Sequence, residues 1–306
     1  MVKKILIALA LTSTLSFAKE KVNHAKIFGS LKHKLASTGN CRVMILSKTG
    51  EVLWQHRGAN MTDVQQLPNK NILFADGGSV TEVTMDNKVV FKYVADAGSH
   101  TGEGTFFAQR LANGNTVISA NAKSRVIEVD SKGKIVFILD LKKVNPNPTH
   151  QNLRLARKLR NGNYLVCHSG KNLVREYTPK GEVVMEIKAK GLAFAALRLP
   201  NKHTVISSLG QITEYDETGK EVWEFKPSKD LPEYGIRNMT GMQYLRNGNL
   251  VVGCYAAYDR KKGTGLGAFE ITRDKKLVWG YRNLKSDNSQ MGVQLLNRRP
   301  TLNIIH

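Results

Sequence analysis

One short phrase recurs five times along the chain, and its period constrains the fold more than any other feature. It reads Leu-X-Asn-Gly-Asn with small variations, and successive copies are 44, 48, 40 and 46 residues apart. The copies lie at residues 67–71, 111–115, 159–163, 199–203 and 245–249. Asn-Gly and its variants accept positive φ at adjacent positions, which a tight hairpin turn requires, and apolar runs flank each copy. Each copy therefore predicts a β-hairpin.

A second phrase follows each hairpin and reads as strand, turn, strand. Its copies lie at residues 80–91, 126–137, 174–185, 212–223 and 268–279. Two hairpins every 40 to 50 residues form a four-stranded unit, which is the content of a propeller blade. Helical solenoids of this period would show apolar residues at 3.6-residue spacing, and the chain does not show them. We therefore expect an all-β fold.

The two ends of the chain each carry half of a further blade. Residues 43–54 repeat the second phrase with no first phrase before it, and residues 293–305 are a degraded first phrase with no second after it. An open propeller would expose an unpaired strand edge at each end. The sequence therefore predicts a single six-bladed β-propeller domain over residues 41–306, with its last blade split between residues 41–57 and 291–306.

The first 18 residues have the three zones of a secretory signal peptide. Lys3 and Lys4 form a basic start, residues 5–17 are apolar, and small residues precede a cleavage position near Ala18. The apolar stretch is shorter than the roughly 20 residues that span a bilayer, so we expect no membrane-spanning segment. Residues 19–40 read as a basic leader. The predicted location is the periplasm or the exterior of the cell.

The chain is strongly basic, with 46 Lys and Arg against 25 Asp and Glu and a net charge of +21. Loss of residues 1–18 would remove Lys3 and Lys4 and no acid, leaving +19. The cations are scattered through every blade without a dense run or interleaved aromatic residues, so we expect no nucleic-acid partner. With 41% hydrophobic residues the chain is not a disordered one.

Three cysteines, Cys41, Cys167 and Cys254, fall in different blades of the repeat. None has a second Cys or a His at metal-ligand spacing, which argues against a structural zinc site. We expect small buried residues, and the alternative of one disulfide in an oxidising compartment stays open.

Three columns of the repeat hold the same kind of residue in nearly every blade. The large apolar column consists of Trp54, Phe91, Phe137, Met185, Trp223 and Trp279. The acidic column consists of Glu82, Glu128, Glu176, Glu214 and Glu270, with Ile45 in the remaining blade. The inner-strand column consists of Gln65, Gln109, Gln243 and Gln294, with Arg157 and Leu197 in the other two blades. Catalysis needs different groups that converge, so such regularity indicates packing and bonds between blades.

The irregular loops of the repeat are where we expect function. They connect the second strand to the third and one blade to the next, so they share one face of the disc. The candidate ligand-binding residues on this face are His56, His100, His150, Arg154, His168, Arg237, Asn238 and Tyr255. Arg offers a planar fork and His a proton that titrates near neutrality, which suits an anionic ligand. The alternative is that these are solvated loop residues with no role in binding.

A metal held by His100, His150 and His168 has no local signature, so we expect no metal site and leave this set as a minor alternative. The glycines of residues 263–267 precede a strand and not a helix, which argues against dinucleotide binding. No G-x-S-x-G or S-x-x-K pattern occurs. We expect no cofactor.

Two repeat phrases carry a resemblance to a known family. Leu-Ala-Asn-Gly-Asn-Thr-Val-Ile at 111–118 and Glu-Tyr-Asp-Glu-Thr-Gly-Lys-Glu-Val-Trp at 214–223 resemble the repeats of exported bacterial PQQ-binding-like β-propeller proteins, which grade into arylsulfotransferase-like propellers. The resemblance covers roughly residues 41–305. Arylsulfate sulfotransferases are also six-bladed and use His and Arg in a central funnel, with His as sulfate acceptor. The quinoprotein dehydrogenases have eight blades, so six blades argue against PQQ.

Two functional hypotheses follow. The first is an exported, monomeric binding propeller whose partner is a small anionic ligand, a glycan or a protein. The alternative is a funnel enzyme of the sulfotransferase-like, group-transfer type, with His100, His150 or His168 as nucleophile or general base and with Arg154 and Arg237 stabilising anionic oxygen.

Overall fold

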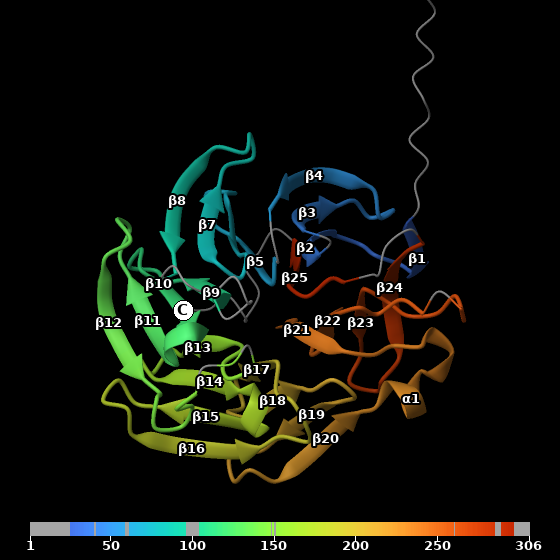
Figure 1. Cartoon of the computed structure of the whole chain (residues 1–306). Helices are drawn as coiled ribbons and strands as arrows, with labels where there is room; N and C mark the ends of the chain where they lie inside the picture. The colour runs from blue at the N-terminus through green and yellow to red at the C-terminus, as the bar shows by residue number, and fades with distance from the viewer. Residues whose placement is uncertain are drawn as a thin grey trace, which may run out of the picture.

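The computed structural model describes residues 25–39, 41–58, 61–95, 104–147, 149, 151–259, 261–284 and 289–296. Within these residues the strands form six sheets around a common centre, as Figure 1 shows. The prediction of an all-β, six-bladed propeller is confirmed. Blades are numbered here from 1 to 6 in chain order.

Four blades are continuous in sequence and follow the repeat. Blade 2 contains β5 (Asp63–Gln66), β6 (Ile72–Ala75), β7 (Ser79–Val83) and β8 (Val89–Val94). Blade 3 contains β9 (Thr105–Arg110), β10 (Thr116–Ala120), β11 (Arg125–Val129) and β12 (Ile135–Asp140). Blade 4 contains β13 (Ala156–Lys158), β14 (Tyr164–His168), β15 (Leu173–Tyr177) and β16 (Val183–Lys188). Blade 5 contains β17 (Ala195–Arg198), β18 (Thr204–Ser207), β19 (Ile212–Tyr215) and β20 (Glu221–Phe225).

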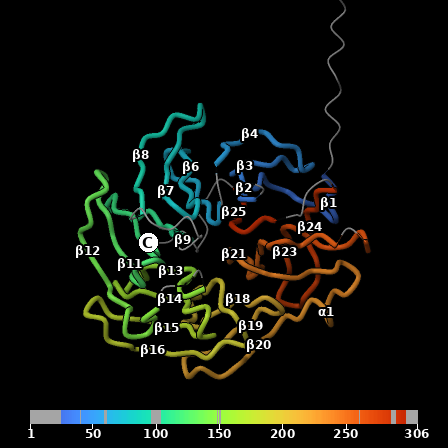
Figure 2. The backbone as a smooth tube through the Cα atoms, viewed as in Figure 1, coloured from blue at the N-terminus to red at the C-terminus, as the bar shows by residue number. Residues whose placement is uncertain are grey.

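Blade 1 is the split blade, and its division differs from the expected one. Its innermost strand is β25 (Val293–Leu296), followed outward by β2 (Lys34–Gly39), β3 (Arg42–Leu46) and β4 (Val52–Arg57). The N-terminal part thus supplies three strands and begins at Lys34, not at residue 41. Figure 2 shows this N-terminal segment beside the C-terminal strand. Residues 297–306 of the expected C-terminal part lie outside the described residues.

Blade 6 has a fifth strand. It contains β21 (Met239–Tyr244), β22 (Leu250–Cys254), β23 (Ala268–Ile271) and β24 (Leu277–Asn283), with β1 (Ala25–Gly29) added to its outer edge. Strand β1 is antiparallel to β24 and places Ile27 opposite Tyr281. Strands β1 and β2 both fall in the segment expected to be a leader, so that expectation does not hold for residues 25–29 and 34–39. Neither strand carries an Asn-Gly turn, which is why the repeat did not reveal them. Strand β2 is nevertheless part of the core, because its Leu35 and Ala36 are completely buried.

Helical structure is confined to short connections in the described residues. They are α1 (Pro227–Asp230) and the 3-10 turns η1 (Asn121–Lys123), η2 (Ser169–Lys171) and η3 (Pro232–Tyr234). No helix in the part of the chain that the structure describes has the length and apolar character needed to cross a membrane.

The Gln column links successive blades, as expected. In four blades the Gln Oε1 accepts a hydrogen bond from a backbone N–H of the next blade's innermost strand, at 2.6–3.1 Å. These residues are Gln65, Gln109, Gln243 and Gln294. Blades 4 and 5 carry Arg157 and Leu197 in this position instead. The seam between blades 4 and 5 and the seam between blades 5 and 6 therefore lack this bond.

The Glu column is also structural, as expected. The Asn71 amide donates to Glu82 at 2.7 Å, and Arg110 of the next blade forms an ion pair with the same carboxylate at 2.8 Å. The carboxylates Glu128 and Glu176 repeat this arrangement with a turn Asn and a cation of the following blade. Each of these carboxylates therefore joins its own hairpin turn to the next blade.

Candidate functional site at the central channel

Arg154 lies at the start of the innermost strand of blade 4, on the face that carries the irregular loops. We call this the loop face, and the opposite face, with the short hairpin turns, the turn face. The Arg154 guanidinium carbon is 4.2 Å from the centre of the Phe106 ring and 5.5 Å from that of Phe194. These rings belong to blades 3 and 5. Arg154 is thus held between two aromatic rings, one from each neighbouring blade.

The Arg154 side chain is only 7% exposed. Burial lowers the pKa of its guanidinium to about 10, because a low-dielectric environment disfavours the charged form. The group still carries its charge at neutral pH. The fold therefore fixes a positive charge at the loop-face end of the inner strands.

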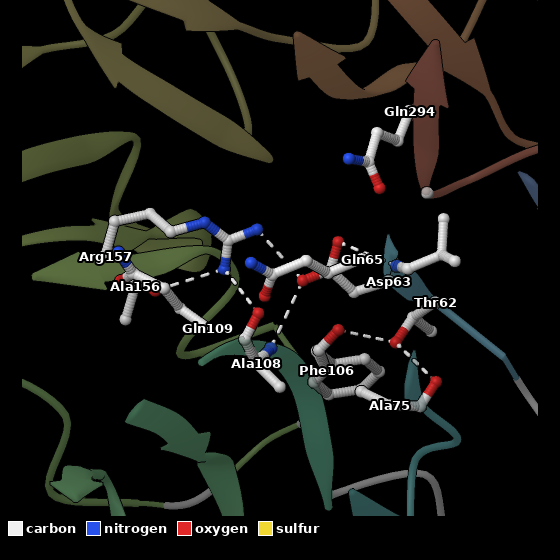
Figure 3. Close-up of polar contacts among 12 residues, drawn as sticks. Thr62, Asp63, Gln65, Ala75, Phe106, Ala108, Gln109, Ala156, Arg157 and Gln294 are labelled. Carbon is white, nitrogen blue, oxygen red and sulfur yellow. Dashed lines mark hydrogen bonds and ion pairs between the residues drawn. The ribbon is translucent and has the colours of Figure 1, made fainter. Parts of the chain in front are cut away.

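An ion pair lies deeper, in the central channel. The Arg157 Nη2 atom is 2.9 Å from the Asp63 Oδ2 atom, and the Asp63 carboxylate also accepts the backbone N–H groups of Val64 and Ala108. Arg157 donates a further bond to the Ala108 carbonyl at 3.1 Å. Figure 3 shows Arg157 reaching across to Asp63. The pair connects the inner strands of blades 2, 3 and 4.

Both members of this pair depart from the repeat. Arg157 replaces a column Gln, and Asp63 occupies an inner-strand position that is apolar or Gly in the other blades. Those residues are Phe107, Leu155, Ala195, Gly241 and Gly292. These two residues are 94 positions apart in the chain, and each neutralises the charge that the other brings into the channel.

Little space remains around the ion pair. The channel cavity, lined by Asp63, Arg157, Gln109 and Gln243 among others, has a volume of about 40 Å³. Sites for small organic ligands measure roughly 300–1,000 Å³, whereas a few tens of cubic ångströms accommodate water. This cavity is too small for such a ligand, so a ligand on the channel axis would have to sit at its mouth.

His168 does not lie on the loop surface as expected, because it is fully buried in blade 4. Its Nδ1 atom is 2.9 Å from the Asn145 amide nitrogen, and its Nε2 atom is 2.8 Å from the Tyr177 hydroxyl. Burial, with smaller contributions from Arg175 and Lys171, lowers its pKa to about 3. A neutral, fully bonded imidazole in the core cannot act as an accessible nucleophile or base.

His56 lies on β4, the outermost strand of blade 1, and not at the channel mouth. Its Nδ1 atom is 3.0 Å from the Asn87 side-chain oxygen, and its ring lies 5.3 Å from that of Phe74. Asn87 and Phe74 belong to blade 2. His56 therefore packs at the seam between two blades.

Three further candidates gather on the loop face where blade 6 begins. Asn238 has a φ of 53°, donates its N–H to the Leu209 carbonyl and accepts the N–H of Tyr255. Arg237 and Tyr255 are both exposed. The structure thus brings Asn238 and Tyr255 together by a backbone bond and leaves the Arg237 side chain at the surface.

His100 and His150 lie outside the described residues. Among the described residues no group of three His, Cys, Asp or Glu side chains is arranged to hold a metal ion. The metal alternative therefore gains no support from His168, whose two ring nitrogens contact Asn145 and Tyr177.

The three cysteines are free thiols. Cys167 and Cys254 are buried as expected, and burial raises the pKa of both thiols. Cys41 differs from the expectation, because it is exposed and has a φ of 56° in the turn between β2 and β3.

The candidate list from the sequence omitted Asp63, Phe106 and Phe194. A signal for Asp63 was available, because it is the acidic exception at a position that is otherwise apolar or Gly. The two Phe residues carried no such signal, since large apolar residues on an inner strand read as core.

No family model matches the chain, and no curated protein matches it. Solved structures share the fold. A protein of unknown function from Bacteroides caccae is 21% identical with a TM-score of 0.69, covering 87% of this chain and 98% of that chain. Virginiamycin B lyase from Staphylococcus aureus is 11% identical with a TM-score of 0.56, covering 88% and 91%.

An extracellular domain attributed to a hybrid two-component system of B. thetaiotaomicron is 13% identical with a TM-score of 0.51, covering 83% of this chain and 34% of that chain. Identities this low show the propeller fold alone. The resemblance to PQQ-binding-like and arylsulfotransferase-like propellers stays a prediction.

Proposed function

We propose that this chain is an exported binding propeller that takes a small anionic ligand at the loop-face mouth of its channel, with Arg154 as the group that holds the anion. The observation that carries the proposal is the Arg154 guanidinium, fixed between Phe106 and Phe194 and charged at neutral pH. A guanidinium that is already held in place loses little side-chain entropy when it binds a ligand, so its hydrogen bonds contribute more to affinity.

Two further features support an anion. The net charge, +21 for the full chain and +19 without residues 1–18, produces a positive field that attracts anions to the propeller. Arg237 is exposed on the same face and adds a second guanidinium. Export is supported by the signal-peptide pattern of residues 1–18 and agrees with the extracellular neighbour. A glycan or a protein partner is less well matched to one buried guanidinium than a small anion is.

The enzyme alternative is not proposed. It needs an accessible His, and His168 is fully buried while His56 is held on an outer strand. His100 and His150 lie outside the described residues.

The test is a thermal-shift panel of sulfate, phosphate, citrate and 4-nitrophenyl sulfate. A ligand present at 100 times its dissociation constant stabilises a folded protein by about 2.7 kcal/mol, which is a measurable shift. We expect at least one anion to stabilise the unaltered protein, and we expect Arg154→Met to abolish that shift and Arg154→Lys to weaken it. Arg246→Met is the control, because it removes one exposed cation from the turn face. A shift retained in Arg154→Met, or no shift with any anion, would contradict the proposal.

A further inference from the structure

A groove separates blades 4 and 5 on the turn face. Its volume is about 770 Å³, within the range of small-molecule sites. Its lining is mixed, and the apolar part consists of Leu159, Val184 and Met185 on blade 4 and Leu199 and Pro200 on blade 5. The rim carries Arg160, Lys202, Glu186 and Glu217. These two cations and two acids balance in charge, so the rim does not favour a ligand of either sign.

The groove occurs at the blade whose large apolar column lacks an aromatic ring. At the seam of blades 2 and 3, the Arg110 guanidinium lies 4.8 Å from the centre of the Phe91 ring. At the seam of blades 5 and 6, the Arg273 guanidinium lies 4.3 Å from the centre of the Trp223 ring. At both seams the cation also pairs with the column Glu. In these blades an aromatic ring therefore covers the cation at the seam to the next blade.

Blade 3 closes its seam with the same groups in a related arrangement. Phe137 stacks on Tyr164 of blade 4 with ring centres 4.9 Å apart and planes 5° apart. Lys158, which pairs with Glu128, lies 5.4 Å from the centre of the Tyr164 ring. The cation at this seam again lies over an aromatic ring.

Blade 4 keeps the ion pair and loses the ring. Arg198 pairs with Glu176 at 2.6 Å, and its Nη2 atom lies 3.0 Å from the Met185 sulfur. The Met185 side chain is narrower than the face of an aromatic ring, and the neighbouring Val184 is 55% exposed. Among the described residues no aromatic side chain lies over Arg198, so the position filled by Phe91 or Trp223 in other blades opens into the groove.

We infer that this groove binds a small molecule through an aromatic ring, which supplies the ring that blade 4 lacks because its column residue is Met185. The ring would lie against the Arg198 guanidinium and the Met185 sulfur, two groups that attract aromatic rings. Leu159 and Leu199 would cover its remaining surface. This site is on the opposite face from the anion site of Arg154 and takes a ligand of different chemistry, so it goes beyond the proposed function.

The test compares 2-naphthol with decahydro-2-naphthol, which has the same carbon skeleton and hydroxyl group but no aromatic ring. The protein is labelled with [¹³C-methyl]methionine, and the Met185 resonance is assigned with Met185→Leu. We expect 2-naphthol to shift the Met185 methyl resonance upfield in a saturable manner, because the ring current acts on a methyl close to the ring face. We expect the saturated analogue to bind at least tenfold more weakly.

A second measurement uses Met185→Phe, which restores an aromatic residue to the column. This variant should weaken 2-naphthol binding at least tenfold in calorimetry and raise the midpoint of thermal unfolding. Met85→Phe is the matched control, because Met85 is an exposed methionine in the turn of blade 2, and it should leave binding unchanged. Arg154→Met should also leave it unchanged, which separates this site from the anion site.

Three outcomes would each overturn the inference. They are a Met185 resonance that does not move at the solubility limit of 2-naphthol, equal binding of the saturated analogue, and full binding by Met185→Phe. The second outcome compares two ligands on the unaltered protein, so the inference can fail even if Met185→Phe does not fold.

Discussion

The central channel and the groove between blades 4 and 5 are both places where the repeat is broken, and the breaks have opposite effects. In the channel, Asp63 and Arg157 each replace a repeat residue, pair with each other, and leave a cavity of about 40 Å³. In the groove, Met185 replaces an aromatic residue and leaves about 770 Å³ open. In the channel, two residues that differ from the repeat have opposite charges and fill the space between them. At the groove, one residue is smaller than its counterparts in the other blades, and the space stays open.

This difference bears on where binding takes place. Blade 4 borders both regions, with Arg157 on its innermost strand and Met185 on its outermost. Its inner edge is held by the ion pair of Asp63 and Arg157, whereas its outer edge borders a groove of about 770 Å³ that has room for a ligand. The experiments below test how firmly each region of this blade is held.

The largest effect is expected from breaking the channel pair. Arg157→Met would leave the Asp63 carboxylate buried without its cation, which costs about 3 kcal/mol or more in the free energy of unfolding. The double variant Asp63→Leu with Arg157→Gln should recover at least half of that loss, because it removes both charges and restores the column Gln. Urea unfolding of Asp63→Leu, of Arg157→Gln and of the double variant gives the coupling energy, and Arg157→Met is measured beside them. A loss below 1 kcal/mol in Arg157→Met would show that the pair does not hold the channel.

An intermediate effect is expected from acid, through His168 in the core of blade 4. Its pKa is about 3 in the folded protein and about 6.5 in the unfolded chain. Between these values the unfolded chain binds the extra proton, so the stability due to His168 is complete above pH 6.5 and falls as the pH falls. The loss from pH 6.5 to pH 5.0 should be about 1.5 kcal/mol.

Urea unfolding at several pH values checks this prediction. His168→Gln should have a shallower dependence on pH than the unaltered protein, whereas His33→Gln, at an exposed position, should not change it. Equal pH dependence in His168→Gln and the unaltered protein would show that another group controls the acid response.

The smallest effect is expected from removing one Gln bond between blades. Gln109→Leu would copy at the seam of blades 3 and 4 the residue that blade 5 has at Leu197. It would leave the Lys158 N–H, now bonded to Gln109 at 2.8 Å, without its acceptor. The expected loss is about 1 kcal/mol in urea unfolding.

Gln66→Leu is the control for this variant, since its amide makes only a 3.5 Å contact near the surface. It should change stability by less than about 0.5 kcal/mol. An equal loss of unfolding free energy in both variants would show that the Gln column does not hold neighbouring blades together. The absence of this bond at the seam of blades 4 and 5 would then not explain the groove.

Much of the fold could be predicted because it depends on local turn chemistry. Asn-Gly turns at a period of 40 to 48 residues give hairpins, and the columns of Gln and Glu follow from that register. Strands β1 and β2 could not be predicted in this way. Neither contains a repeat phrase. Strand β1 pairs with β24, and β2 pairs with β25 on one side and with β3 on the other.

The candidate site was predicted less well. Arg154 was a candidate from the sequence because it starts an inner strand on the loop face, but its aromatic neighbours come from blades 3 and 5 and belong to no shared motif. His168 follows a strand and precedes a turn, which suggested a surface position. It is buried because Asn145 and Tyr177 bond both ring nitrogens.

The sequence by itself determined the number of blades, the register of each hairpin and the residues that join one blade to the next, because these depend on contacts within a repeat or between adjacent repeats. Only the tertiary structure decided which of the residues that differ from the repeat come into contact. Asp63 and Arg157 are 94 residues apart and become neighbours only when the ring closes around a common axis. Met185 leaves a groove only because the blade beside it also provides no ring to fill the space.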